Sequence, residues 1–119
     1  RPDMKTLNFD ASTDEFAQFS VAMPKSWNEG TITYQVYWTS ASTNTGNVIW
    51  GLQGVACADS DTIDVAYGTA VTVAGSPTAG ELSYFQVFRD ANDGSDTFSA
   101  DAKLLGVKIF FTTDAANDA

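Results

Sequence analysis

The sequence contains no histidine and only one cysteine, Cys57. Histidine is the most common general base and metal ligand, so its absence excludes Ser-His-Asp and Cys-His catalytic arrangements and any ordinary zinc site. A single cysteine excludes a disulfide within the chain. In the stretch "GVACADS" we expect Cys57 to act as a small buried hydrophobic residue at a strand end rather than as a reactive thiol.

Basic residues are also scarce. The chain has 6 lysines and arginines against 15 aspartates and glutamates, which gives a formal net charge of -9. This charge repels phosphates, so nucleic acid is not an expected partner. The glycine spacings match neither a dinucleotide fingerprint nor a phosphate-binding loop. No apolar run approaches the roughly 18 residues needed to cross a bilayer, so membrane insertion is not expected either.

Strict alternation of apolar and polar residues runs through much of the chain. In "TITYQVYW" the most apolar side chains fall on one face, and threonine, glutamine and Tyr37 fall on the other, which is typical of a half-buried strand. The same period occurs in "NVIWGLQGVA", "LSYFQVFR" and "LLGVKIFFTT", and more weakly in "MKTLNF", "EFAQFSV" and "TAVTVA". The positions predicted to face the core are Ile32, Tyr34, Val36, Trp38, Trp50, Leu52, Val107 and Ile109.

These strands predict an all-β fold, an antiparallel β-sandwich of jelly-roll type with about seven or eight strands. We expect one long hairpin over residues 31–56 and a second hairpin that joins "LSYFQVFR" to "LLGVKIFFTT". At most one short helix is expected, within "DSDTIDVAYG", where an aspartate can cap its start and Gly68 can end it. The 119 residues, 44% of them hydrophobic, suit a single domain over residues 1–119. From the start "RPDM" we expect that a native N-terminal anchoring segment is missing.

The sequence offers no set of residues suited to catalysis. Its only glutamates are Glu15, Glu29 and Glu81, and each stands at a predicted strand edge or turn. No nucleophile is accompanied by a base. Paired carboxylates of the kind used in glycoside hydrolysis stay open as an alternative in a chain with 15 acids. We nevertheless predict that the protein is not an enzyme.

The segment "RDANDGSD", residues 89–96, gathers acidic and amide side chains around a glycine. Calcium binds about six to eight oxygen ligands, and Asp90, Asn92 and Asp96 alternate in part as in helical calcium loops. However, Asp93 directly precedes Gly94, one residue short of the usual spacing, and no helix with a bidentate glutamate follows. We therefore predict a turn between two strands, with positive φ at Gly94, and no cofactor. A calcium site of irregular spacing at these four oxygen-bearing residues stays open as the alternative.

Trp27 and Tyr37 are the candidates for a recognition surface. Sugar-binding β-sandwiches use exposed tryptophan and tyrosine rings as stacking platforms. Trp27 stands in a polar turn, "PKSWNEG", and Tyr37 shares a strand face with threonine and glutamine, whereas Trp38 and Trp50 lie on apolar faces that predict a place in the core. For Trp27 and Tyr37, burial in the core is as well supported as contact with a glycan or another partner.

The last predicted strand carries apolar residues on both faces. One face holds Leu104 and Phe110, and the other holds Leu105, Val107, Ile109 and Phe111. One of these faces can pack on the core, and the other needs a cover. Few apolar residues elsewhere in the chain are unassigned, so we expect Leu104 and Phe110 to meet a second copy of the chain in a closed homo-oligomer.

Three stretches of the sequence carry a resemblance to a known group of proteins. They are Pro24-x-x-Trp27-x-x-Gly30 before a strand that ends in Trp38, an Asp-rich turn before Tyr67-Gly68-Thr69, and the closing Asp101-Ala102-x-Leu104-Leu105-Gly106-Val107. With these marks, essentially the whole chain resembles small virion structural proteins of tailed bacteriophages, of the capsid-decoration or fibre type, from phages of aquatic bacteria. One departure is that Val71-Thr72-Val73 runs directly into Ala74-Gly75, where the group has a longer connection.

The resemblance implies a structural protein on the exterior of a phage particle. Its β domain would decorate the capsid or form the head of a head or tail fibre, in contact with other virion proteins. Because such fibres and decorations are usually trimeric, the resemblance also implies a homotrimer. The alternative function, from another class, is a glycan-binding module for receptor recognition, in which Trp27 and Tyr37 would lie exposed side by side and contact a host-surface glycan.

Overall fold

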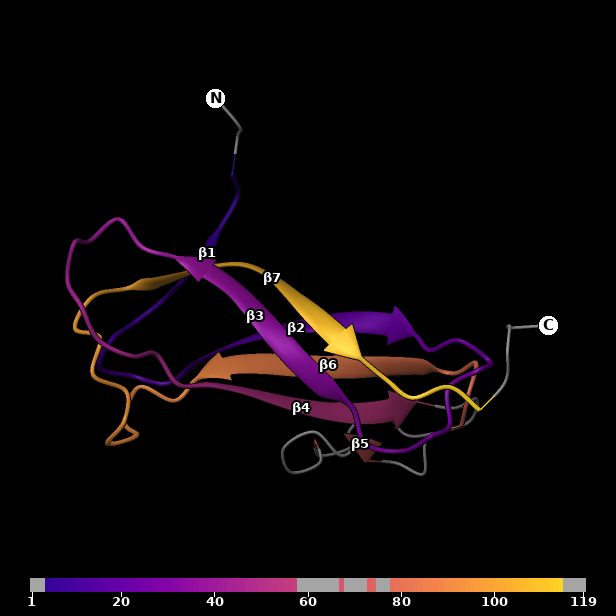
Figure 1. Ribbon diagram of the computed structural model, residues 1–119. Coiled ribbons are helices and arrows are strands. Elements are labelled where there is room, and N and C mark those ends of the chain that lie inside the picture. Colours follow the sequence, from indigo (N-terminus) through magenta and orange to yellow (C-terminus); the bar gives the residue numbers. More distant parts are fainter. Residues whose placement is uncertain (1–3, 58–66, 68–72, 75–77, 115–119) are drawn as a thin grey trace. The chain divides into compact units, whose positions relative to one another are not determined.

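In the part of the chain that the structure describes, all regular secondary structure is β-strand (Figure 1). The computed structural model describes residues 4–57, 67, 73–74 and 78–114. The strands are β1 (Leu7–Phe9), β2 (Glu15–Ala22), β3 (Thr33–Thr39), β4 (Trp50–Cys57), β5 (Val73–Ala74), β6 (Leu82–Arg89) and β7 (Ala102–Phe110). The predicted all-β class is confirmed, and these residues include no helix long and apolar enough to cross a membrane. The short helix predicted within residues 59–68 lies, apart from Tyr67, outside the described residues.

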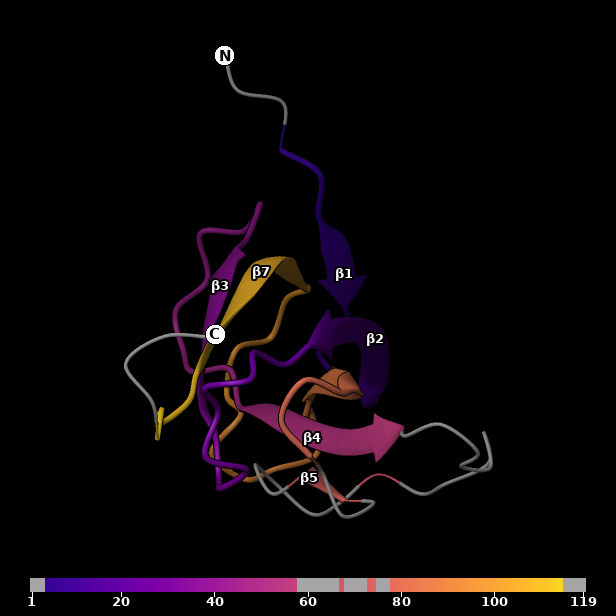
Figure 2. The same ribbon diagram turned by 90° about the vertical axis from the view of Figure 1, so that its right-hand side faces the viewer.

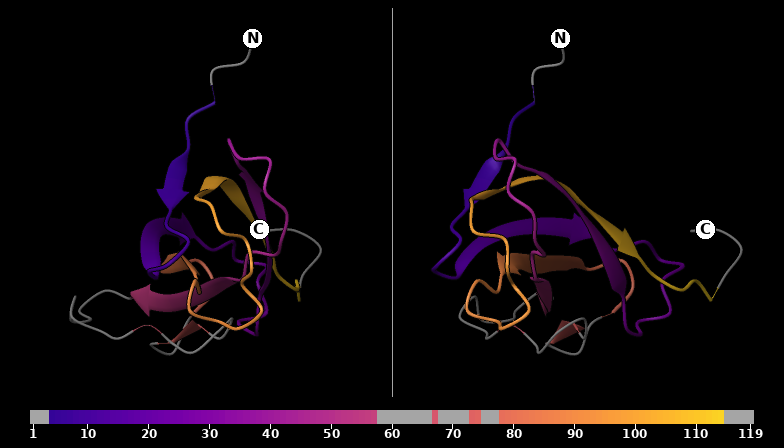
Figure 3. Two further views of the ribbon diagram at one scale, coloured as in Figure 1. Left: turned by 90° about the vertical axis from the view of Figure 1, so that its left-hand side faces the viewer. Right: turned by 60° about the vertical axis from the view of Figure 1, so that its left-hand side comes forward.

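The strands form a three-stranded sheet in the order β1-β7-β3 and a four-stranded sheet in the order β2-β6-β4-β5. Figures 2 and 3 show β7 between β1 and β3. The arrow of β6 runs opposite to those of β2 and β4 in Figure 1, and β1 pairs antiparallel with β7, with Leu7 opposite Leu104. The two-residue β5 is an exception to the predicted antiparallel arrangement, because it pairs parallel with β4.

Both predicted hairpins are wrong. β3 pairs with β7 and not with β4, and β6 belongs to a different sheet from β7. The connections explain the error, since residues 40–49 separate β3 from β4 and residues 90–101 separate β6 from β7. Hairpin loops usually have about two to five residues, so connections of this length leave the next strand free to join the other sheet.

Contacts between residues divide the chain into two units. Unit 1 contains residues 1–17, 34–51 and 87–108, and unit 2 contains residues 18–33, 52–86 and 109–119. The segments alternate along the sequence, so β2, β3, β4, β6 and β7 each contribute residues to both units.

Aromatic rings form the core of unit 1. Trp38 of β3 contacts the ring of Phe98 edge to face at 5.5 Å and the ring of Trp50 at 6.4 Å, and Trp50 in turn contacts Phe9 at 5.1 Å. Aromatic pairs in this range of distances stabilise a core beyond the area that they bury. The alternation on β3 is as predicted, because its even-numbered side chains are partly buried and its odd-numbered side chains are exposed.

Unit 2 has a core of its own. The predicted core residues Ile32 and Leu52 are almost completely buried there, together with Met23 and Phe85. Phe19 of β2 stacks on Phe85 of β6 with the ring centres 5.5 Å apart. The two strands therefore share an inward face, and every second residue of each strand belongs to the opposite face.

Candidate functional site

The loop after β6 is organised by Arg89, whose side chain is completely buried. Its guanidinium donates from Nε and Nη2 to the two carboxylate oxygens of Asp96, at 3.0 and 2.8 Å. Nη1 donates to the backbone oxygens of Phe9 and Ala100, at 3.3 and 2.8 Å, and Nη2 also donates to that of Phe98. One cation therefore holds β1 and both sides of the loop within unit 1, and its donors are matched to fixed acceptors.

Asp96 is held from two directions. Its Oδ2 accepts a hydrogen bond from the backbone N–H of Ile49 at 3.1 Å as well as the bond from Arg89. Burial raises the pKa of the Asp96 carboxyl, but the hydrogen bonds from Arg89 and Ile49 and the Arg89 charge outweigh burial, so the pKa lies below its usual value. Asp96 is thus a structural anion rather than a free ligand.

The other acids of the loop repel one another. Burial raises the pKa of the Asp90 carboxyl, and the charges of Asp14, Asp93 and Asp96 raise it further. Asn92 donates to Oδ1 of Asp14 from its backbone and its side chain, both at 3.4 Å. Sequence reasoning missed Asp14, because it precedes β2 and is far from the loop along the chain.

The four calcium candidates form the turn that the sequence predicts, but not with the predicted backbone. The N–H of Asp93 bonds to the oxygen of Asp90, and the N–H of Asp96 bonds to that of Asp93. Positive φ at Gly94 is wrong, since the described glycines with positive φ are Gly46 and Gly80. No group of three or more acidic, cysteine or histidine side chains is placed to hold a metal within the described ranges. The absence of a calcium requirement stays a prediction.

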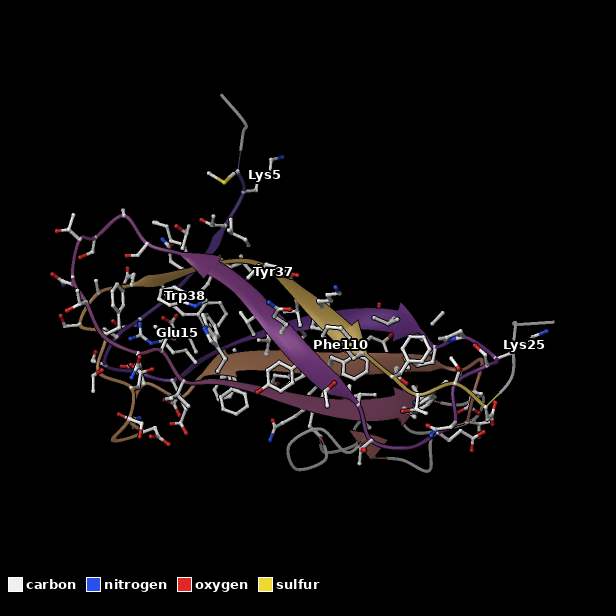
Figure 4. All side chains as sticks on the ribbon, viewed as in Figure 1. Lys5, Glu15, Lys25, Tyr37, Trp38 and Phe110 are labelled. Carbon is white, nitrogen blue, oxygen red and sulfur yellow. The ribbon has the colours of Figure 1, made fainter. Side chains whose placement is uncertain are left out.

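The structure separates the two aromatic candidates by exposure. Trp27 is 1% exposed, so of its two open alternatives the structure supports burial in the core. Tyr37, labelled on β3 in Figure 4, is 45% exposed. The turn that carries Trp27 pairs with the far end of the described chain, through a bridge to Thr113 and a bond from the Asn28 N–H to the Thr112 oxygen at 2.9 Å. Local polarity could not reveal this pairing, and a buried indole offers no face to a sugar.

The two residues proposed for self-association also differ in exposure. Leu104 is 8% exposed and Phe110 is 44% exposed, so Leu104 is a core residue and its predicted place on an outer face is wrong. The neighbouring Leu105, predicted to face the core, is exposed instead. The buried side of β7 changes around Gly106, and a glycine inside a strand often marks such a bulge or bend.

The outward side of the four-stranded sheet forms, within unit 2, a surface that sequence reasoning did not single out. We call it the uncharged face, because none of its nine strand positions carries a charge, in a chain of net charge -9. Its members are Gln18, Ser20 and Ala22 of β2, Gln53, Val55 and Cys57 of β4, and Leu82, Tyr84 and Gln86 of β6, and of these nine only Val55 is buried.

Three glutamines cross the uncharged face as a ladder of amides. Nε2 of Gln18 donates to Oε1 of Gln86 at 3.3 Å, and Nε2 of Gln86 donates to Oε1 of Gln53 at 3.4 Å. Each amide carries two N–H donors and one oxygen acceptor, so the bonds of the ladder leave donors and acceptors for a further partner. The alternation in β2 and β6 predicts that Gln18 and Gln86 lie on one face of their strands. It does not show that the three glutamines are neighbours, which follows from the hydrogen bonds.

Tyr84 lies on the same face, two residues before Gln86 on β6, and is 40% exposed. Burial raises the pKa of the Tyr67 hydroxyl, and Tyr84 raises it further, so the two phenols lie near each other. The uncharged face therefore combines a row of amides with an exposed aromatic ring.

Unit 1 has an aromatic pair of its own on β2 and β6. The rings of Phe16 and Phe88 lie 5.5 Å apart, and Phe88 covers the backbone of Gly51 so closely that a Cβ on Gly51 would meet the ring at 2.2 Å. The absence of a side chain at Gly51 is what allows the Phe88 ring to approach β4 this closely.

A shallow depression of about 310 Å³ lies near the end of β3 and the start of β7. It is lined by Ser40, Ala41, Ser42, Ala100, Asp101 and Lys103. Nζ of Lys103 donates to Oδ1 of Asn8 at 2.9 Å, and Oγ of Ser40 donates to the backbone oxygen of Asp101 at 3.3 Å. Because these polar groups already have partners in the protein, the depression is a weaker candidate than the uncharged face.

Comparisons of the chain with models of protein families, with curated protein sequences and with solved structures found no match. The resemblance to virion structural proteins of tailed bacteriophages therefore stays a prediction.

Proposed function

We propose that the protein is a structural component of a tailed bacteriophage, a β domain on the exterior of the particle that decorates the capsid or forms the head of a fibre. The proposal rests on the sequence resemblance and on one structural observation, the strand order β1-β7-β3 and β2-β6-β4-β5. That order fits a jelly roll, a β architecture that is frequent in viral capsid proteins and lectins. A shared fold does not by itself assign a function, so the particle itself must provide the test.

The strand pairs support the jelly-roll assignment. A jelly roll of eight strands forms when a long antiparallel ribbon folds over, so that the first strand pairs with the last and the second with the next to last. The pairs β1 with β7, β2 with β6, and β4 with β5 follow this rule, and the described residues supply no strand for the remaining place beside β3. Within unit 1, the contact of Trp38 with Trp50 joins the two sheets as in a sandwich. The parallel pairing of β5 is the departure from this scheme.

The proposal includes a non-catalytic role and assembly as a homotrimer. Many copies of a decoration protein lie close together on a particle, and a net charge of -9 opposes their unspecific aggregation. Large apolar side chains that are exposed on a single chain, among them Leu105 and Phe110, favour contact with further copies or with other virion proteins.

The test is to find the chain on the particle. Antibodies raised against the purified protein should label the outside of intact virions in immunogold electron microscopy, and a virion map should show its density in threefold clusters. Absence of the chain from purified particles would contradict the virion role. Single, separated copies in the map would contradict the trimer alone.

A further inference from the structure

We propose that the uncharged face binds a neutral oligosaccharide, in the row formed by Gln18, Gln86 and Gln53 together with the ring of Tyr84. This inference does not depend on the virion role, because it rests on the chemistry of one sheet face within unit 2. It also places recognition on a different sheet from Tyr37, the exposed aromatic residue that the sequence suggested.

The uncharged face matches a neutral ligand in charge. None of the nine strand positions of the uncharged face is acidic or basic, so the face offers no counter-charge to a carboxylate, sulfate or ammonium group. The net charge of -9 further opposes acidic ligands. A neutral ligand is therefore the one whose charge matches this face.

The amide row matches a hydroxylated ligand in its hydrogen bonding. The ladder uses one N–H of Gln18 and one N–H of Gln86, while Gln53 takes part only through its oxygen. A ligand hydroxyl can donate and accept, as can each amide, so a polyhydroxylated ligand can bond to all three amides. The bonds between the amides also hold their side chains in one row, which lowers the entropy lost on binding.

The ring of Tyr84 offers a surface on which a sugar can stack. Tyr84 is 40% exposed and lies beside the amide row on β6. The face of an aromatic ring is negatively polarised and attracts weakly positive C–H groups. A pyranose ring presents C–H groups on its flat side and hydroxyls at its rim, so one sugar unit can stack on Tyr84 while the next bonds to the amides.

A second copy of the chain fits this face less well. If a second copy covered the amide row, each buried N–H donor left without an acceptor would cost about 1–3 kcal/mol. Stable contacts between identical subunits are more apolar than the rest of the surface. The amide row therefore favours a hydroxylated ligand.

The experiment measures binding of the full chain to maltohexaose, cellohexaose and mannohexaose, with an alginate hexamer as the acidic control. At least one neutral hexaose should bind with a Kd of about 1 mM or tighter, and alginate should bind at least about tenfold more weakly. In the wild-type protein, the side-chain amide signals of Gln18, Gln53 and Gln86 should shift on addition of the neutral hexaose. This readout needs no variant.

Matched variants locate the site. Tyr84→Ala and Gln18→Glu should each weaken binding at least about tenfold. Tyr37→Ala and Gln35→Glu make the same changes at exposed positions on β3 and should alter binding less than about twofold. Failure of all three neutral hexaoses to bind at about 10 mM would overturn the proposal, as would equal losses with Tyr84→Ala and Tyr37→Ala. A change of oligomeric state in Gln18→Glu, without loss of sugar binding, would assign the face to a second copy instead.

Discussion

Arg89 and Asp96 form a paired ion bridge in which Nε meets Oδ2 at 3.0 Å and Nη2 meets Oδ1 at 2.8 Å, and neither side chain is exposed to solvent. The geometry is bidentate, which suits a guanidinium and a carboxylate. The backbone oxygens of Phe9, Phe98 and Ala100 accept further bonds from the same cation. The buried ion pair is therefore the structural centre of the acidic loop.

Replacing Asp96 with asparagine should strongly destabilise the fold. The variant leaves the buried Arg89 without its counter-charge, and removal of one partner of a buried ion pair costs about 3–5 kcal/mol. Urea unfolding of the Asp96→Asn variant measures the loss. Asp93→Asn is the matched control, because Asp93 is exposed and its carboxylate accepts a local bond from the Ser95 N–H, so the variant should change stability by less than about 0.5 kcal/mol. Equal stability of the two variants would contradict the role of the ion pair.

The contribution of Asp96 should disappear in acid. The pKa of Asp96 in the folded protein lies below the ordinary value of 3.8, so its ionised form is favoured by folding. Such a group adds stability above its unfolded pKa, and this stability is lost as the pH falls through its folded pKa. The difference in unfolding free energy between the wild type and Asp96→Asn should stay constant above about pH 5 and shrink below pH 3.8. A difference that grows in acid would contradict this assignment.

The sequence predicted the strands better than their partners. An alternating pattern such as "LSYFQVFR" shows which residues share a face, and β6 covers those residues, Leu82–Arg89. It does not show which strand lies alongside, because neighbours are set by long connections and by contacts across the chain. The predicted phase failed only in the first half of β7, where Leu104 is buried and Leu105 is exposed. After Gly106 it holds, because Val107 and Ile109 are partly buried.

The candidate site was predictable only in part. The sequence left the exposure of Tyr37 and Trp27 open. Tyr37 is exposed, whereas the burial of Trp27 depends on pairing with residues near Thr113 and has no local signal. Arg89 did leave a signal that was missed. It follows Phe85 and Val87 on the inward side of β6, and a charged residue at an inward position requires a partner.

Gly51 should tolerate a methyl group only when Phe88 is absent. A Cβ on Gly51 would lie 2.2 Å from the Phe88 ring, so Gly51→Ala must push the ring away and weaken its contact with Phe16. In the Phe88→Ala background the same substitution should be neutral or stabilising, since glycine inside a strand is unfavourable. Thermal unfolding of the four proteins in this double-mutant cycle should give a coupling of about 1 kcal/mol or more. Gly94→Ala is the control, because a Cβ there meets nothing within 4 Å. If the effects of Gly51→Ala and Phe88→Ala on stability are additive, the predicted clash is wrong.

Trp27 and Tyr37 should differ sharply on truncation. Trp27→Ala removes an almost completely buried side chain and should cost about 3–5 kcal/mol of unfolding free energy. Tyr37→Ala removes a side chain that is 45% exposed and should cost less than about 1 kcal/mol. Denaturant unfolding of both variants measures the difference. A mild effect at Trp27 would show that the turn at residues 24–28 does not depend on this burial.

Calcium should be dispensable for folding. Asp96 is occupied by Arg89, and Asn92 is held by Asp14, so two of the four candidate ligands have protein partners already. When calcium is present at a hundred times the Kd of its site, binding stabilises the folded protein by about 2.7 kcal/mol. This raises the Tm of a small domain by several degrees. Addition of a chelator to the purified protein should therefore leave its Tm unchanged within about 1 °C. Because divalent ions also screen a net charge of -9, calcium must be compared with magnesium at equal ionic strength. A rise in Tm of several degrees with calcium alone, removed by Asp90→Asn, would show that the loop is a calcium site.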